Sequence, residues 1–441
     1  MRILIVSPFF PPQHAVASLR AHSFAHAWAD AGHDVSVLTT EKRADQAGLE
    51  LAPVGFGVTA IPVPRRWGLE QLRGADHAEP ETPSESSSPG WIRVLRAARG
   101  RTGVYSGLRM PDLTDAWVRP ALAWAREQPP WDAVVSSSGP YTAHLVGLHL
   151  RREQHAGTWF ADFRDLWTAN HLASGLFPFT LRERSLEQQV FDDADAIVTV
   201  SDGLADRLRT AAATPVHVVY NGFATEEIAS LNGARRLDEQ HVHLAYTGTL
   251  YPRGQDPRPL LAGLARLRRD EPTLADRVRL VVAGTRADLW RAPARELGVE
   301  SRLDVRGLVP RDEALRLQRD AHALVSIEWS QPYSGVLSGK LLEYLPWETP
   351  ILVVGGPPDG SIARLVAEAD RGDAVGSDPA TIAAWIGRLA RDPAACRRPG
   401  RPEVTDRYRR AAQAARLLRL LEAAVSNRPE SGSRSLASAS S

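Results

Sequence analysis

Residues 2–12 read RILIVSPFFPP, and the architecture of the chain is first visible there. The run at 2–6 predicts a strand buried on both faces, as in a parallel sheet, and the Ser-Pro step ends it in a rigid loop. Apolar residues then recur at helical spacing over 18–31, and Gly32 is typical of a helix C-cap. A second strand is expected at 34–39, so the three elements form a βαβ unit with parallel strands.

The same pattern of a strand, a small-residue turn and a helix recurs along the chain. Further strands are expected at 132–136, 158–161, 196–200 and 217–220, and then, after a restart, at 243–246, 279–283, 303–306, 323–327 and 351–354. The sequence therefore predicts an α/β protein with two tandem Rossmann-like, doubly wound domains. Ligands of such sheets bind at the carboxyl ends of the strands, so we expect a site between the two domains.

The expected domain boundaries follow from changes in composition. The first domain is predicted at 1–222 and the second at 241–402, joined by a charge-rich segment. A final amphipathic helix, at about 405–424 within a segment 403–425, is expected to pack back toward the first domain. The Ser-, Pro- and Glu-rich residues 75–90 predict a disordered insertion, and residues 426–441 predict a disordered tail.

Bulk composition narrows the class of protein. The chain has 441 residues, 43% hydrophobic residues and a net charge of +1, which is typical of a globular protein without general attraction to nucleic acid. A single cysteine, Cys396, excludes an intrachain disulfide and favours the cytoplasm. The apolar run at 3–6 is too short for a signal peptide, and no apolar stretch reaches the length of a membrane span.

The stretch 91–101 mixes Trp, Ile, Val and Leu with four arginines. One interpretation is an amphipathic contact with an anionic membrane surface, which would place the protein at the inner face of a membrane. The other interpretation is a surface helix with a solvated arginine face.

Lysine is nearly absent: of 53 basic residues, only Lys42 and Lys340 are lysine. Lys340 lies in SGVLSGKLLEY, residues 334–344. A compact ammonium behind a loop of small residues can reach a phosphate oxygen that a broad guanidinium would crowd. Glu343 lies one helical turn further and offers a carboxylate for sugar hydroxyls. Lys42 shows that a lysine also occurs in this chain without such a motif.

Three other strand ends of the second domain are candidate donor contacts. Backbone amides at Gly248 and Thr249 would face a diphosphate, and Arg253 would add charge. Gly284-Thr285 and Gly307-Leu308 are either walls for a base and ribose or simple tight turns.

In the first domain, the opposing wall is expected to carry acceptor-side residues, namely Ser7, Pro8, Ser138 and Asp162. Asp162, Arg164 and Asp165 cluster at a predicted strand end, where ligands bind. The alternative is a salt-bridged turn in which Asp165 caps the next helix.

No cofactor or metal is expected. The sequence Asp193-Ala194-Asp195 matches a D-x-D pattern, but we interpret it as a solvated turn at a helix end and not as a metal site. We find no Cys/His cluster with zinc-ligand spacing, no phosphate-binding P-loop and no nucleophile elbow.

Several short motifs in order carry a family resemblance. They are RILIVSPFFPP (2–12), AGHDVSVLT (31–39), ADFRDLW (161–167), DAIVTVS (195–201), YNGF (220–223), YTGTL (246–250), KLLEYL (340–345) and TPIL (349–352). Together they resemble the family 4 type glycosyltransferases with the GT-B fold. The resemblance implies transfer of a hexosyl or N-acetylhexosaminyl group from a nucleotide diphosphate sugar to an acceptor hydroxyl, with retention and without an essential metal. It places the donor on the second domain and implies glycan or glycoconjugate biosynthesis. The predominance of arginine over lysine separately favours a bacterial genome of high GC content.

The resemblance also implies residue roles. Glu343 corresponds to the carboxylate that holds the ribose, and Lys340 with Gly248 and Thr249 to the diphosphate contacts. Arg164 stands where many relatives place a histidine near the transferred sugar, and with Asp165 and Lys340 it forms the catalytic set.

Two departures from the family pattern concern the predicted contacts to the transferred sugar and to the diphosphate. Gly335 stands where many relatives carry a second glutamate, so the amides around Gly335 and Val336 would have to bind the sugar. The first loop, at 13–18, has alanines where relatives often have glycines.

Two other functions fit the same architecture. A nucleotide-sugar 2-epimerase would recruit Asp162, Asp165 or Glu328 as acid or base. A catalytically inactive protein would bind nucleotide sugar without turnover.

Overall fold

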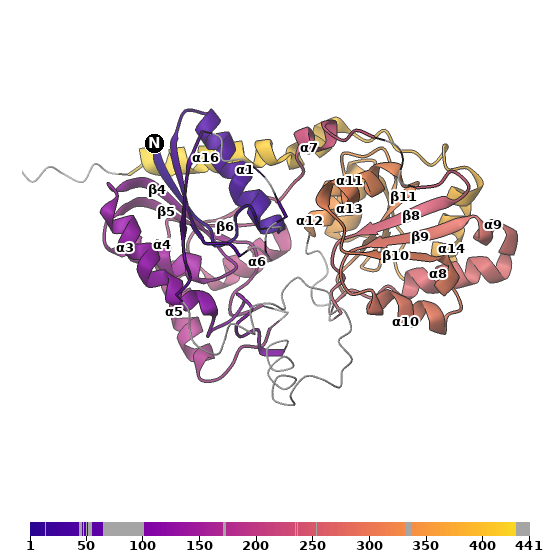
Figure 1. Ribbon diagram of the computed structural model, residues 1–441, viewed down its shortest axis with the longest axis horizontal. Helices are drawn as coiled ribbons and strands as arrows, with labels where there is room; N and C mark the ends of the chain where they lie inside the picture. Colours follow the sequence, from indigo (N-terminus) through magenta and orange to yellow (C-terminus); the bar gives the residue numbers. More distant parts are fainter. Residues whose placement is uncertain are drawn as a thin grey trace, which may run out of the picture.

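The computed structural model contains two parallel sheets, one in each half of the chain (Figure 1). The structure describes residues 1–13, 15–43, 46, 48–49, 51, 55–64, 101–170, 173–233, 235, 237–252, 254–330 and 337–428. The predicted insertion at 75–90, residues 91–100 of the arginine-rich stretch and the tail from 429 lie outside the described residues.

The first sheet has the order β3-β2-β1-β4-β5-β6-β7, and all its pairs are parallel. Its strands are β1 (Arg2–Val6), β2 (Asp34–Thr40), β3 (Gly57–Ile61), β4 (Trp131–Ser137), β5 (Ala156–Phe163), β6 (Ala196–Thr199) and β7 (Val216–Val218). The strand order reverses between β1 and β4, and this switch point is where open α/β sheets bind ligands.

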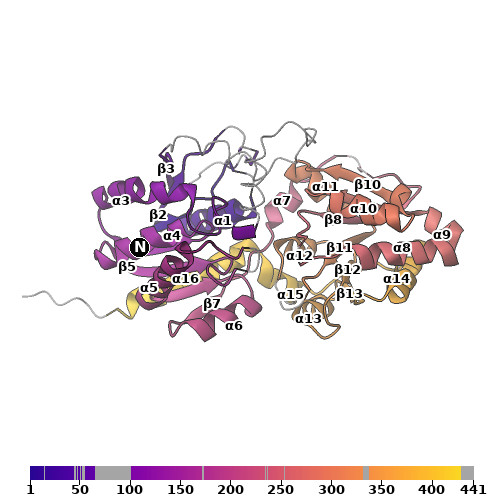
Figure 2. The same ribbon diagram turned by 90° about the horizontal axis from the view of Figure 1, so that it is seen from below.

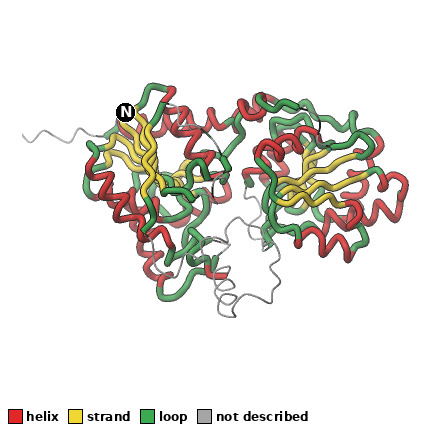
Figure 3. The backbone as a smooth tube through the Cα atoms, viewed as in Figure 1, coloured by secondary structure: helices red, strands yellow, loops and turns green. Residues whose placement is uncertain are grey.

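Helices cover both faces of this sheet (Figure 3). They are α1 (Val16–Asp30), η3 (Leu113–Trp117), α3 (Val118–Glu127), α4 (Thr142–Arg152), α5 (Phe179–Asp193) and α6 (Asp202–Ala211). Ile3 and Ile5 of β1 pack in the cluster with α1, whereas Leu4 and Val6 pack in the cluster with α3 and α4. Burial of successive residues on opposite faces explains why the strands read as unbroken apolar runs.

The second sheet repeats this topology with the order β10-β9-β8-β11-β12-β13. Its strands are β8 (Val242–Thr247), β9 (Val278–Ala283), β10 (Leu303–Gly307), β11 (Ala323–Ile327), β12 (Ile351–Val354) and β13 (Gly372–Ala374). The switch point lies between β8 and β11, so the loops after these two strands flank the expected ligand position. The predicted fold class, two tandem doubly wound α/β domains, is confirmed.

The helices of the second half of the chain are α7 (Thr225–Ala229), α8 (Arg258–Asp270), α9 (Pro272–Asp276), α10 (Asp288–Glu296), η4 (Glu300–Arg302), α11 (Arg311–Asp320), α12 (Gly339–Tyr344), α13 (Ser361–Glu368), α14 (Pro379–Arg391), α15 (Pro402–Thr405) and η5 (Asp406–Tyr408). Residues of α8, α10 and α14 pack on one face of the sheet, and residues of α11, α12 and α13 pack on the other.

The last helix, α16 (Arg410–Ser426), returns to the first domain and lies along α1 (Figure 2). Trp28 of α1 donates from its indole nitrogen to the carbonyl of Ala414 at 2.9 Å. Leu417 and Leu421 of α16 are fully buried against this face of the first sheet. The chain therefore crosses between the domains twice, once after β7 and once before α16.

The predicted strands agree with the structure within one or two residues, and the bounds of β1, β11 and β12 are as predicted. Two strands, β3 and β13, were not predicted. Both are short edge strands, and neither is an unbroken apolar run, so they lack the pattern that marks the central strands. Among the described residues, no helix is both long and apolar enough to cross a membrane.

Candidate active site

Lys340 lies at the carboxyl edge of the second sheet, beside the loop after β8. Its Nζ donates to the carbonyl of Thr249 at 2.9 Å and to the hydroxyl of Tyr246, and it lies 4.1 Å from the centre of the Tyr246 ring. Burial lowers the pKa of Lys340 to about 7. The structure thus brings together two loops that the sequence analysis placed on either side of one ligand position.

Close backbone packing joins the loops after β8, β9 and β10. A side-chain carbon at Gly284 would lie 2.0 Å from the carbonyl oxygen of Gly248, so only glycine fits there. The Gly284 amide donates to the carbonyl of Gly307 at 2.7 Å, and the Thr285 hydroxyl donates to that of Thr249 at 3.0 Å. Five predicted donor residues therefore share one edge of the sheet.

Gly248 keeps the space in front of Lys340 open. Its φ of +108° is a conformation that favours glycine. A side-chain carbon at this position would lie 3.6 Å from Cε of Lys340. Leu308, at the end of β10, is 54% exposed and so presents an apolar surface beside the same edge. The predicted contacts Arg253, Gly335 and Val336 lie outside the described residues.

Glu343 belongs to a cluster of four charged side chains, which we call the crossover cluster: Glu227, Arg311, Glu343 and Arg410. Oε1 of Glu343 accepts from Nη2 of Arg311 at 2.9 Å and from Nη2 of Arg410 at 3.3 Å. The same guanidinium groups donate to Glu227 at 2.6 and 3.2 Å.

Sequence reasoning missed three members of the crossover cluster. Arg410 is 67 residues from Glu343 and 183 residues from Glu227, so no local pattern joins them. The charges of Glu343 and Glu227 hold the pKa of Arg311 above its usual value, although burial opposes this. Arg311 is therefore charged and orients the carboxylates of Glu343 and Glu227, to which it donates.

Ser7 and Pro8 form the first loop at the carboxyl edge of the first sheet. The Ser7 hydroxyl donates to the carbonyl of Phe9 at 2.7 Å and is almost fully buried. The Pro8 carbonyl accepts from the hydroxyl of Thr40 at 3.0 Å and from the ammonium of Lys42. Both predicted acceptor-side residues thus also hold the loop together.

Asp162 is fully buried and bound to Arg20, a partner that the sequence analysis did not identify. Its carboxylate accepts from the Arg20 guanidinium at 2.8 and 3.0 Å and from the Ser137 hydroxyl at 2.8 Å. Burial alone would raise the pKa of Asp162, but Arg20 and Ser137 hold it below its usual value. The carboxylate is therefore ionised and saturated by its own domain.

Arg164 and Asp165 follow β5 directly. The Arg164 guanidinium donates to the carbonyls of Ser138 and Gly139, the latter at 2.9 Å, and lies 5.6 Å from the ring of Phe9. This contact ties the loop after β5 to the loop after β4, which carries the predicted residue Ser138. Asp165 is exposed and does not cap the next helix, which begins at Phe179.

The charge of Asp165 also acts on a residue of the second domain. Loss of water around the Asp165 carboxyl group raises its pKa, and Arg164 opposes this shift. Burial, together with the charge of Asp165, raises the pKa of Tyr251, which lies in the loop after β8. The loops after β5 and β8 are therefore coupled through charge.

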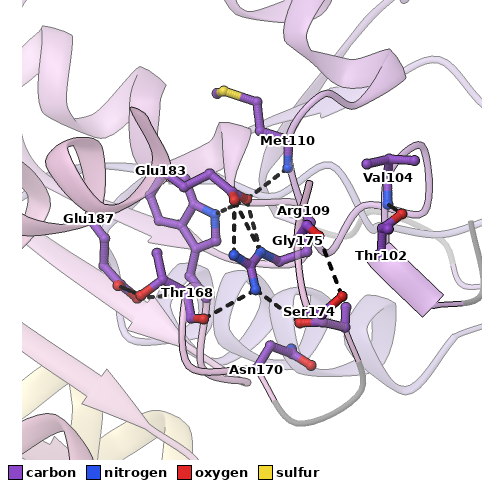
Figure 4. Close-up of polar contacts among 12 residues, drawn as sticks. Thr102, Val104, Arg109, Met110, Thr168, Asn170, Ser174, Gly175, Glu183 and Glu187 are labelled. Atoms are coloured by element: carbon purple, nitrogen blue, oxygen red, sulfur yellow. Dashed lines mark hydrogen bonds and ion pairs between the residues drawn. The ribbon is translucent and has the colours of Figure 1, made fainter. Parts of the chain in front are cut away.

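A buried ion pair supports the segment between β5 and α5 (Figure 4). Arg109 donates to both carboxylate oxygens of Glu183, at 3.0 and 2.9 Å, and to the carbonyls of Thr168 and Ala173 at 3.1 and 2.9 Å. Glu183 also accepts from the indole of Trp167 at 3.2 Å. This network holds the segment that follows Arg164 and Asp165.

Within the described part of the chain, one group of side chains could hold a metal ion, namely Asp238, His241 and His243. It lies where β8 begins, at the opposite end of the strand from Thr247 and therefore away from Lys340. Asp195 of the D-x-D sequence instead pairs with Arg151 at 2.7 Å. Asp193 pairs with Arg152 at 2.6 Å, so both carboxylates have structural partners.

Comparisons with known proteins agree with this geometry. Residues 17–222 match the model of the glycosyl transferase 4-like domain. No curated protein matches the chain at the level of sequence.

Three solved structures share the overall architecture. An α,α-trehalose-phosphate synthase (UDP-forming) from Burkholderia xenovorans has a TM-score of 0.62 at 14% identity, over 96% of this chain and 100% of that one. A sucrose-phosphate synthase from Thermosynechococcus elongatus has a TM-score of 0.61 at 16% identity, over 96% and 100%. A putative UDP-N-acetylglucosamine 2-epimerase from Listeria monocytogenes has a TM-score of 0.53 at 12% identity, over 97% and 98%.

At these identities the structural likeness shows the fold alone. The family model gives independent evidence from sequence for residues 17–222. Residues 17–222 therefore match a glycosyl transferase 4-like domain, and the whole chain shares its two-domain GT-B fold with the two synthase structures.

Proposed function

We propose that the protein is a retaining glycosyltransferase that moves a hexosyl or N-acetylhexosaminyl group from a nucleotide diphosphate sugar to an acceptor hydroxyl, without an essential metal. The observation that carries the proposal is the meeting of Lys340 with Thr249 at the switch point of the second sheet. A cation and a glycine loop at this position suit a diphosphate, and residues 17–222 match the model of a glycosyl transferase 4-like domain.

In this proposal the diphosphate lies against Lys340 and the loop of Gly248 and Thr249. The ribose hydroxyls bind Oε2 of Glu343, because both arginine contacts in the described part of the chain are to Oε1. The base lies against Thr285, Gly307 and Leu308. Contacts from Arg253, Gly335 and Val336 to the donor are also part of the proposal.

The chemistry follows from where charge develops. The bond between the anomeric carbon and the diphosphate oxygen breaks while the acceptor oxygen bonds to that carbon from the same face. The leaving phosphate oxygen takes the acceptor proton, so no separate base is needed. Lys340 and the local amides stabilise the charge on the departing diphosphate, as preorganised donors do at a developing anion.

The first domain would supply the acceptor side. Nη1 of Arg164 has no hydrogen-bond partner among the described residues, so this cation can face the transferred sugar or the diphosphate. Exposed Asp165 is available to an acceptor hydroxyl. In this proposal Asp162 does not bind the acceptor directly, because its carboxylate already accepts hydrogen bonds from Arg20 and Ser137. It contributes by positioning these neighbours.

Release of nucleoside diphosphate from a panel of nucleotide sugars tests the proposal. One donor should release its nucleoside diphosphate, faster with a hydroxyl acceptor than without, and excess EDTA should leave the rate unchanged. The anomeric proton coupling of the first product should match that of the donor. Inverted product would overturn retention, and loss of activity in EDTA would overturn metal independence.

The same assay separates the rival functions. A 2-epimerase, which the fold of the Listeria structure favours, would convert the donor to its epimer without an acceptor. An inactive protein would bind nucleotide without releasing product. Among the carboxylates that an epimerase would recruit, Asp162 is committed to Arg20, which weighs against that function.

We also place the protein in the cytoplasm. Membrane contact through 91–101 stays a separate proposal, and sedimentation with anionic vesicles would test it.

A further inference from the structure

The crossover cluster reaches from the proposed ribose site to both points where the chain passes between the domains. We propose that Arg410 is a positioning residue that orients Glu343 for the ribose and couples the nucleotide site to the interdomain crossing. This inference rests on the proposed function, because it assigns a role to a residue that supports the same site.

At the ribose end, two guanidinium groups hold one carboxylate. Arg311 and Arg410 both donate to Oε1 of Glu343, at 2.9 and 3.3 Å. Oε2 accepts no hydrogen bond from the described residues. Contacts from two directions on one oxygen fix the carboxylate plane and leave the other oxygen for a ligand hydroxyl. Hydrogen bonds to charged groups are the strong ones in proteins, so this arrangement is rigid.

At the other end, Arg410 joins the two interdomain connections. Its Nε donates to the carbonyl of Gly222 at 3.0 Å, and its backbone amide donates to the carbonyl of Phe223 at 2.8 Å. The Phe223 amide in turn donates to Tyr408 at 3.2 Å. A side-chain carbon at Gly222 would lie 2.2 Å from the Tyr408 carbonyl oxygen, so the two connections are in direct contact.

The charges of the cluster balance only when Arg410 is present. Glu227 and Glu343 share Arg311 and Arg410, which gives two negative and two positive groups. Without Arg410, two carboxylates compete for Arg311, and Glu343 loses one of its two orienting contacts. Arg410 is only 8% exposed, so water cannot replace the missing charge well.

This geometry predicts a selective defect. A ligand that uses Glu343 should lose affinity when Arg410 is replaced, whereas a ligand that uses only Lys340 and the loop at 248–249 should not. A nucleoside diphosphate belongs to the first kind, and inorganic pyrophosphate belongs to the second. An arginine that only stabilised the fold would affect both ligands to the same extent.

The test is isothermal titration calorimetry of the full chain with the nucleoside diphosphate that binds best and with inorganic pyrophosphate. Arg410→Gln should weaken the nucleoside diphosphate roughly tenfold or more and leave pyrophosphate within about twofold. In a Glu343→Gln background, Arg410→Gln should change nucleoside diphosphate affinity by less than about twofold, because coupled residues are not additive. Arg409→Gln is the matched control, since the Arg409 side chain pairs, among the described residues, with Asp406 alone, at 2.7 Å.

Arg410→Lys provides a second variant that keeps the charge but not the planar fork. Its nucleoside diphosphate affinity should fall between those of the wild type and Arg410→Gln, with pyrophosphate unchanged. Equal losses for the two ligands, or additive effects of Arg410→Gln and Glu343→Gln, would overturn the role of Arg410 while the proposed function stands. If the wild type binds pyrophosphate but no nucleoside diphosphate, the proposed function fails instead, and the inference fails with it.

Discussion

The two lysines of the chain occupy similar surroundings and differ in how their ammonium groups are satisfied. Each lies beyond the carboxyl end of a strand, and burial lowers the pKa of each to about 7. Lys42 donates to three oxygens of its own domain, in Pro8, Thr39 and Thr40. Lys340 donates to two, in Tyr246 and Thr249, within the described part of the chain.

A lysine ammonium has three donors, so this difference decides which lysine can serve a ligand. Lys42 uses its full capacity to close the loop after β1. Lys340 uses two of its donors on described residues, which leaves one for a ligand at the switch point of its sheet. Burial and pKa alone would assign the same role to both lysines. Their hydrogen-bond partners instead indicate that Lys42 is structural and that Lys340 can bind a ligand.

Replacing each lysine by alanine should give the largest difference between the two residues. Lys340→Ala should lower kcat/KM roughly 100- to 1,000-fold, because a preorganised cation opposite the leaving group is lost. Lys42→Ala should leave the Kd for the nucleoside diphosphate within about twofold, although it lowers thermal stability. Steady-state kinetics and calorimetry on both variants check this, and equal loss of nucleotide affinity in both would refute the distinction.

The pH dependence of binding gives the next largest effect. A diphosphate binds the ammonium form of Lys340, and with a pKa of about 7 that form is lost as pH rises. The Kd for the nucleoside diphosphate should therefore increase about 15-fold between pH 7 and pH 8.5, where the phosphates are already ionised. Lys340→Ala should abolish this dependence, and Lys42→Ala should keep it. A flat profile in the wild type would contradict the assignment.

Gly284→Ala tests whether the loop after β8 must stay in place for Lys340 to bind the donor. The new side-chain carbon would meet the Gly248 carbonyl at 2.0 Å and push away the loop whose Thr249 carbonyl holds Lys340. We expect roughly tenfold weaker binding of the nucleoside diphosphate by calorimetry. Gly233→Ala is the control, because Gly233 also has a positive φ, of +103°, but no atom within contact distance. Equal effects of the two substitutions would point to general strain instead.

The smallest expected effect concerns the partners of Lys42. Thr40→Val keeps the shape of the side chain but removes the hydroxyl that accepts from Lys42 at 2.7 Å. The free energy of unfolding should fall by about 1 kcal/mol, measured by denaturant titration, with donor affinity unchanged. A change in donor affinity would show that the environment of Lys42 also serves the ligand.

Much of this account could be predicted from the sequence, because its physical causes are local. Strands such as β1 and β11 are buried on both faces and therefore appear as unbroken apolar runs. Because ligands of such sheets bind at the carboxyl ends of strands, the sequence predicted that Lys340 and Thr249 contribute to one site.

The unpredicted parts depend on contacts between distant residues. Arg20 lies 142 residues from Asp162, and Arg410 lies 183 residues from Glu227, so neither pair leaves a periodic or compositional trace. Asp162 was therefore expected to face the acceptor, whereas in the structure its carboxylate is buried against Arg20. The cluster of Asp238, His241 and His243 was missed as well, although two histidines two residues apart at the start of a strand are a local signal.

In the proposed function, the second domain binds a nucleotide diphosphate through Lys340 and Glu343. The most direct measurement is a thermal-shift screen of UDP, GDP, dTDP, ADP and CDP against the wild type and Glu343→Ala. Because a ligand raises the melting temperature only by binding the folded state, one nucleotide should stabilise the wild type and not the variant. Equal stabilisation of both proteins, or of neither by any nucleotide, would contradict the claim.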